Sequence, residues 1–188
     1  MIYSTLNIPQ SHLNCTFDNY DFSDGKKLLR DHLDKFVAGS RKGIVFIGKP
    51  GVGKTHLLVS SYFALQNRDV LPGSQVVYFD YQELLNYLRE GFSSSIRADT
   101  AVNKLCSVEY LLVDDIKPES TGEFWHQILT QIIEYSYNAK TKLMLSTNAD
   151  SQEELVERWR LSDYHLSRLI ALCDVVVLKG IDRRMTNA

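Results

Sequence analysis

The sequence predicts an α/β protein in which a five-stranded parallel sheet is sandwiched between helices. Five short apolar runs alternate with helical patterns along the chain, and the runs are continuously apolar, as in strands buried on both faces. Parallel strands need right-handed crossovers, which place helices on both sides of the sheet. The chain has 188 residues, 44% hydrophobic and 23% charged, so it has the size and composition of one domain with an ordinary core.

The chain begins with a polar, turn-rich stretch that has no sustained apolar period. We therefore expect an extended N-terminal lead-in over residues 1–25 and a core domain over residues 26–188. Apolar residues then recur at helical spacing from Leu28 to Phe36, and Gly39 is a stop signal for this helix. The first strand is expected at 43–47 and leads directly into Gly48.

The rest of the core continues the same alternation. Helical patterns are expected at 55–66, 81–89, 98–106 and 123–137. Apolar runs predict the remaining strands at 76–79, 110–113, 142–146 and 174–178. Ser151 and Glu154 form a capping-box pattern, which opens another helix that runs to about Arg160.

Charge and cysteine content exclude several classes of protein. The chain has 21 Lys and Arg against 23 Asp and Glu, which argues against nucleic-acid binding by bulk positive charge and leaves room for a local basic patch. Cys15, Cys106 and Cys173 are far apart, as expected of reduced thiols. No apolar run approaches the roughly 18 residues that span a bilayer, and the histidines have no ligand spacing. We expect a cytoplasmic protein without a membrane segment or structural metal.

A P-loop pattern, G-x-x-x-x-G-K-[ST], lies between the first predicted strand and the helix that follows it. Its glycines let backbone N–H groups converge on phosphates, Lys54 neutralises the β- and γ-phosphates, and the Thr55 hydroxyl ligates magnesium. A chance glycine-rich turn is the alternative, which the strand and helix on either side disfavour. The candidate nucleotide-binding residues are Gly48, Pro50, Gly51, Val52, Gly53, Lys54, Thr55 and His56.

Polar side chains also follow two later strands. Asp114 and Asp115 end the run at 110–113, where Asp114 is the candidate magnesium ligand and Asp115 the candidate general base. Asn148 follows the next strand, at the sheet edge where open α/β sheets bind ligands, and can orient the hydrolytic water. The alternatives are solvated turn carboxylates and a turn asparagine that caps the next helix.

Two arginines near the C-terminus could stabilise phosphate charge. Arg168 follows a helix and precedes the last strand, and Arg184 lies just beyond that strand. Taken alone, either would be read as an ordinary exposed arginine.

Together these motifs resemble the AAA+ ATPase core of bacterial replicative helicase loaders of the DnaC and DnaI type, and their relatives, the IstB-type transposition helpers. The resemblance covers nearly the whole chain. The matching segments are Ile8-Pro9 with 13–20 (the family's lead-in), 48–55 (Walker A), 111–115 (Walker B), 146–148 (first sensor), 167–169 (arginine-finger box) and 180–184 (second sensor).

The resemblance implies that Arg168 acts in trans on the nucleotide of a neighbouring subunit and that Arg184 acts in cis, so hydrolysis requires self-assembly. It implies ATP or ADP with Mg2+ as ligands, and a hexameric replicative helicase and single-stranded DNA as partners. The stretch 81–106 would carry the DNA-gripping helix. Its candidate DNA contacts are Arg89, Phe92, Arg97 and Lys104, and the plain alternative is a solvated helix face with Phe92 in the core.

The function predicted from the sequence is therefore a Mg-ATP-dependent helicase loader. Asp115 stands where this family usually has glutamate, so slow hydrolysis is expected. A transposition helper acting on duplex DNA is the nearest alternative, since both use the same core. A nucleotide kinase would need an Arg-rich lid segment, which we do not find, and a switch that binds ATP with little turnover stays open.

Overall fold

The computed structural model describes residues 8–22, 27–68, 75–93, 98–117 and 122–182, and the side chains within them except 90–93 and 98–99. All strand pairs in its five-stranded sheet are parallel, in the order β2-β3-β4-β1-β5. The strands are β1 Gly43–Ile47, β2 Val76–Asp80, β3 Tyr110–Asp114, β4 Lys142–Thr147 and β5 Cys173–Val177. The parallel sheet between helices predicted from the sequence is thus confirmed.

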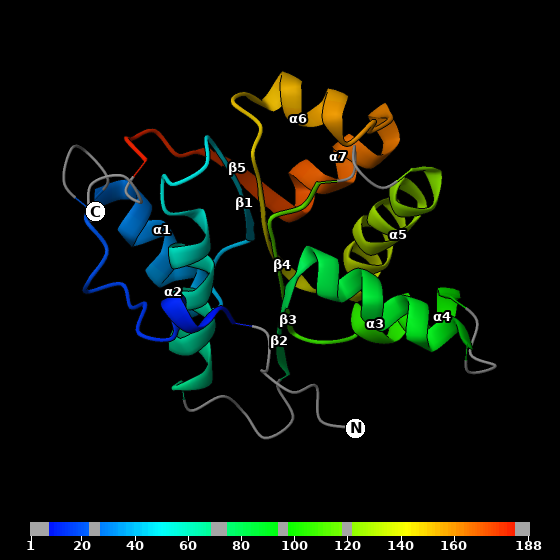
Figure 1. Cartoon of the computed structure of the whole chain (residues 1–188), viewed down its shortest axis with the longest axis horizontal. Helices are drawn as coiled ribbons and strands as arrows, with labels where there is room; N and C mark the ends of the chain where they lie inside the picture. The colour runs from blue at the N-terminus through cyan, green and yellow to red at the C-terminus, as the bar shows by residue number, and fades with distance from the viewer. Residues whose placement is uncertain (1–7, 23–26, 69–74, 94–97, 118–121, 183–188) are drawn as a thin grey trace.

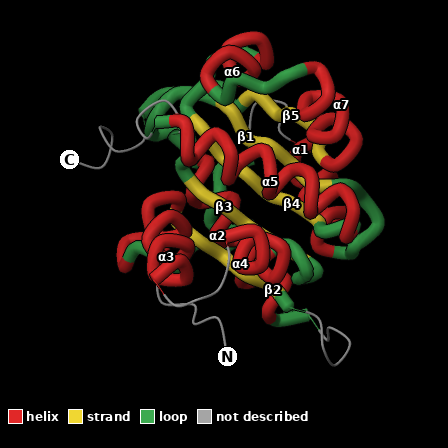
Figure 2. The backbone as a smooth tube through the Cα atoms, turned by 90° about the vertical axis from the view of Figure 1, so that its right-hand side faces the viewer, coloured by secondary structure: helices red, strands yellow, loops and turns green. Residues whose placement is uncertain are grey.

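Helices cover both faces of the sheet (Figure 1). They are α1 Lys27–Val37, α2 Lys54–Gln66, α3 Tyr81–Ser93, α4 Ala98–Leu105, α5 Glu123–Ala139, α6 Gln152–Arg158 and α7 Asp163–Leu172. Side chains alternate across the strands, so Ile44 and Phe46 pack under α1 and α2, whereas Val45 and Ile47 belong to the core under α3, α4, α5 and α7. Figure 2 looks onto this second layer of helices.

The described part of the lead-in packs against the core. It contains the short 3-10 helix η1 Gln10–His12, which lies next to α2. Ile8, Cys15, Phe17 and Tyr20 are buried in the same core as α1 and α2. This segment therefore forms part of the wall beside the P-loop.

Helix α7 was not predicted from the sequence. Ser162 is its N-cap, and its side chain accepts a hydrogen bond from the His165 backbone N–H. Asp163 in the first turn is a further start signal. The capping box expected at Ser151 and Glu154 is confirmed, with the Glu154 N–H donating to Ser151 Oγ at 3.2 Å. Among the described residues, no helix has the length and apolar character needed to cross a membrane.

Candidate functional site

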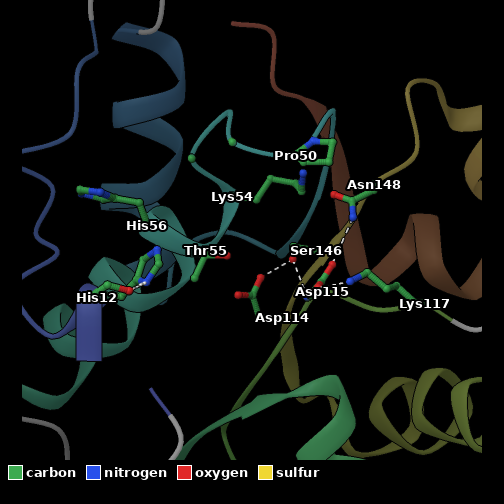
Figure 3. A pocket seen from close by; sticks show the side chains of 13 residues that line it. His12, Pro50, Lys54, Thr55, His56, Asp114, Asp115, Lys117, Ser146 and Asn148 are labelled. Carbon is green, nitrogen blue, oxygen red and sulfur yellow. Dashed lines mark hydrogen bonds and ion pairs between the residues drawn. The ribbon is translucent and has the colours of Figure 1, made fainter. Parts of the chain in front are cut away.

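A cavity of about 710 Å³ lies at the carboxyl edge of the sheet, between the P-loop and the ends of β3 and β4 (Figure 3). The predicted residues that line it are Pro50, Gly51, Gly53, Lys54, Thr55, His56, Asp114, Asp115 and Asn148. Ser11, His12 and Lys117, for which no role was predicted, line it as well, as does Ser146 of the 146–148 segment. Gly48 and Val52 instead line a smaller adjoining hollow beside the end of β5.

The P-loop backbone requires glycine at two crowded positions. Gly51 has φ +79°, and a Cβ there would lie 1.8 Å from Oδ1 of Asp182. Gly53 has φ +100°, and a Cβ there would lie 2.7 Å from the Tyr20 ring, whose hydroxyl donates to the Val52 carbonyl oxygen at 3.4 Å. The loop is thus held in its cradle shape by segments from both ends of the chain.

Lys54 opens α2 and is buried within this cradle. Its ammonium donates to the carbonyl oxygens of Gly48 at 2.6 Å and Lys49 at 2.8 Å. In this fully described helix, the N-cap is Gly53, which has no side chain that could cap the helix. The first turn contains no acidic residue. The N–H groups of the first turn, the helix dipole and the ammonium suit an anionic phosphate group.

Asp114 is a buried carboxylate at the end of β3. Oδ1 accepts a hydrogen bond from the Ser146 hydroxyl, and Oδ2 accepts one from the Tyr78 hydroxyl at 3.3 Å. Burial, followed by the charge of Asp114, raises the pKa of Tyr78, so this phenol stays a neutral donor. Two hydroxyls on neighbouring strands therefore fix the orientation of the Asp114 carboxylate. Asp114 lines the cavity.

Asp115 sits in a left-handed backbone conformation, φ +55°, which few non-glycine residues adopt. Its backbone N–H donates to Ser146 Oγ at 2.9 Å, and its Oδ1 accepts from Asn148 Nδ2 at 3.2 Å. Its Oδ2 lies 2.5 Å from the ammonium of Lys117. The structure thus brings Asp115 and Asn148 together as the sequence suggested and adds a cation. The one sequence signal for Lys117 is its place two residues after the acidic pair.

The two candidate arginine sites lie in different surroundings. Arg168 is on α7 and is not among the residues that line the cavity. Its guanidinium carbon lies 3.5 Å from the centroid of the Tyr164 ring and 5.2 Å from that of Tyr137. Arg184 lies outside the described residues, but Asp182, two residues earlier, is packed on Gly51 of the P-loop.

The candidate DNA contacts are only partly described. Arg89 is exposed on α3, with its guanidinium carbon 5.1 Å from the centroid of the buried Trp125 ring of α5. Lys104 is exposed in the last turn of α4. The side chains of Phe92 and Arg97 lie outside the described residues.

The chain matches one protein-family model and is similar in sequence to several known proteins. The model of the family described as "IstB-like ATP binding protein" matches residues 3–188. The Replicative helicase loader DnaC of Buchnera aphidicola subsp. Acyrthosiphon pisum is 26% identical over 169 residues, and that of Escherichia coli strain K12 is 26% identical over 148 residues. These matches cover 83% and 76% of this chain, and 67% and 58% of those relatives.

Solved structures share the fold. The crystal structure of the DnaC helicase loader has a TM-score of 0.76 at 22% identity, over 91% of this chain and 100% of that chain. AMPPCP-bound DnaA from Aquifex aeolicus has a TM-score of 0.71 at 22% identity, over 92% and 51%. The crystal structure of DnaI has a TM-score of 0.70 at 20% identity, over 95% of each chain. At these identities the likeness concerns the fold alone, and it confirms the predicted fold class.

Proposed function

The chain belongs to the family of IstB-like ATP binding proteins and has the AAA+ fold, and on this premise we propose that it hydrolyses ATP and acts in DNA replication as a helicase loader. The observation that carries this proposal is the convergence of Lys54, the Asp114–Asp115 pair and Asn148 on one cavity. A cation at a helix N-terminus faces two carboxylates there. This is the arrangement that phosphoryl transfer from a nucleoside triphosphate needs.

The P-loop side of the cavity binds phosphate in this proposal. Lys54 and the first N–H groups of α2 hold the phosphate oxygens, with Lys54 exchanging its two carbonyl partners for them. The Thr55 hydroxyl and an Asp114 carboxylate oxygen are the hard oxygen ligands that Mg2+ prefers, and they would hold that ion. When bound, Mg2+ neutralises charge that builds up on the phosphates.

The opposite side of the cavity directs water. Asp115 is the general base, and Asn148 both donates to it and can orient the water through its amide oxygen. Aspartate reaches about one methylene less far than glutamate, so we expect slow turnover. Arg168 lies on α7 instead of lining its own cavity, which supports a role in trans in an assembled oligomer, with Arg184 acting in cis.

A hexameric replicative helicase and single-stranded DNA are the partners in this proposal, which rests on the relation to DnaC. Arg89 and Lys104, exposed on α3 and α4, would contact DNA phosphates, with Phe92 and Arg97 nearby in the chain. The three cysteines are free and buried, which fits a reducing cytoplasm.

The test is steady-state turnover of ATP and GTP across a range of protein concentrations, with and without single-stranded DNA. Turnover selective for ATP, rising more than linearly with protein and shifted by DNA, is the expected result. Turnover independent of concentration and DNA, and dependent on a small phosphoryl acceptor, would contradict the proposal and indicate a kinase.

A transposition helper acting on duplex DNA is the second candidate, and the family match is the observation that favours it. The same assay separates the two. Stimulation by duplex DNA, with no response to single strands or to a hexameric helicase, would favour the transposition role.

A further inference from the structure

We propose that Lys117 is a second phosphate-binding cation of the cavity, which leaves Asp115 and contacts the terminal phosphate when a nucleoside triphosphate binds. The inference deepens the proposed function and rests on nucleotide binding at this cavity. It assigns to Lys117 the discrimination between a triphosphate and a diphosphate.

The backbone beside Lys117 is fixed to the edge of the sheet. The Ile116 N–H donates to the Ser146 carbonyl oxygen at 2.8 Å, and the Thr147 hydroxyl donates to the Ile116 carbonyl oxygen at 2.7 Å. The Asp115 N–H is bonded to Ser146 Oγ in the same way. Lys117 therefore projects from an anchored stretch of chain, and its long side chain can change partner without a movement of the sheet.

The Lys117 ammonium lies inside the site. It is 2.5 Å from Asp115 Oδ2, and Lys117 lines the same cavity as Lys54 and Thr55. Figure 3 shows Lys117 on the wall formed by the ends of β3 and β4, across the cavity from the P-loop residues. The side chains of Lys117 and Asp115 are 45% and 38% exposed. An ion pair this open to solvent is weakly held, so an exchange of partners costs little.

The charges in the cavity favour that exchange. A terminal phosphate next to Asp115 would place two anions close together, which is unfavourable. Lys117 can lie between them, because a lysine ammonium is a mobile point charge with three donors. A diphosphate lacks the terminal group and leaves the Asp115–Lys117 pair intact. The same movement uncovers Asp115 Oδ2, the oxygen that Lys117 covers here.

The test compares the affinities of the Mg2+ complexes of ADP and of a β,γ-methylene analogue of ATP, measured by isothermal titration calorimetry. Lys117→Met keeps most of the unbranched side chain and removes its charge. We expect it to weaken binding of the analogue about tenfold or more, the value of a hydrogen bond to a charged group, and to change ADP affinity less than twofold. Lys117→Arg should retain most of the preference for the analogue.

Asp115→Asn supplies the decisive comparison. Because Lys117 then no longer has to leave the Asp115 carboxylate, we expect the analogue to bind several-fold more tightly while ADP affinity is unchanged. In the double variant Asp115→Asn with Lys117→Met, this gain should disappear. If the gain in analogue affinity persists in the double variant, Asp115 merely repels the terminal phosphate. That result would contradict the proposed movement of Lys117 from Asp115 to the phosphate.

The matched control is Lys35→Met, which breaks another exposed lysine–aspartate pair, 2.7 Å from Asp31 on α1. It should leave both affinities unchanged, and its melting temperature sets the scale for loss of a surface pair. An unchanged ratio of analogue to ADP affinity in Lys117→Met would refute the assignment of Lys117. If the unmodified protein bound neither nucleotide, the proposed function would fail first, and this inference with it.

Discussion

Charged side chains gather at both ends of the sheet, and the two clusters are built differently. At the amino edge, Asp174 of β5 has two cationic partners, Lys42 at 2.9 Å and Arg41 at 3.2 Å, and the His32 imidazole lies 3.2 Å away. At the carboxyl edge, Asp114 is held by two hydroxyls, and Asp115 by the Asn148 amide and Lys117. The first cluster saturates its carboxylate, whereas the second surrounds a cavity.

This difference separates charge used for stability from charge available to a ligand. Lys42 also donates to the Ile170 carbonyl oxygen, which ties the amino-edge cluster to α7. At the carboxyl edge, Asp115 and the crowded P-loop glycines have backbone conformations with positive φ, which side chains rarely adopt. Proteins keep such strained positions mainly at functional sites. The same residue types therefore have different roles at the two edges, and the following variants test that assignment.

The largest effect is expected for Arg168→Ala. An arginine finger contributes about a thousandfold or more to turnover, so ATP binding should persist while hydrolysis falls by that factor. Mixing this variant with a Lys54 variant should restore some activity at mixed interfaces, as measured by phosphate release. No rescue, with assembly intact, would mean that the carboxyl-edge site is complete within one chain.

Asp115→Asn and Asp174→Asn form the next comparison. A general base contributes about 10² or more to the rate, so Asp115→Asn should lower turnover at least a hundredfold and trap bound ATP. Asp174→Asn should leave turnover unchanged and reduce the free energy of unfolding by about 1 kcal/mol, since its side chain is 28% exposed. Equal effects of the two substitutions on turnover would remove the distinction between the edges.

The lysines permit a smaller comparison of the same kind. Lys54→Ala removes the phosphate cation and should weaken ATP binding about tenfold to a hundredfold. Lys42→Ala, at the amino edge, should leave ATP affinity within twofold and lower the melting temperature. Calorimetric titration and thermal unfolding measure the two quantities, and an ATP affinity of Lys54→Ala within about twofold of that of the unmodified protein would contradict the phosphate-cradle role.

Most of the fold, and the residues at which to look for a site, could be predicted from the sequence, for a physical reason. The strands are buried on both faces, so they are continuously apolar, and the P-loop needs its residues at consecutive positions. Tyr78 and His12 carry no such local signal, because they meet the site through strand order and packing of the lead-in. The partner of Lys117 depends equally on tertiary geometry.

Helix α7 shows a second kind of limit. Six of its ten residues are apolar, but only Leu169 is fully buried, and the helix runs directly into β5 at Cys173, so no Gly or Pro marks its end. The sequence signal that could have located the start of this helix is its N-cap residue, Ser162. Arg168 was therefore assigned on the resemblance of its motif, and its stacking on Tyr164 became evident only from the structure.

The smallest effect is a pH dependence of stability that originates at the amino edge. Burial, followed by the positive charge of Arg41, lowers the pKa of His32 below its ordinary value of 6.5, and the attraction of Asp174 does not offset these effects. The folded protein thus binds fewer protons at His32 than the unfolded chain. Its contribution to stability is fully present above about pH 6.5 and is lost as the pH falls through the folded pKa.

Asp174 acts in the same direction at lower pH. Burial opposes its ionisation, but hydrogen bonds from Lys42 and Arg41 dominate and lower its pKa below the ordinary 3.8. We therefore expect the free energy of unfolding, measured by urea titration, to fall gradually from pH 7 to pH 5. His32→Gln should make that decline shallower without abolishing it, because burial also lowers the pKa of His165. Since neither group lines the cavity, ATP affinity of His32→Gln at pH 7 should match that of the unmodified protein, and a loss of affinity would show that the two edges are coupled.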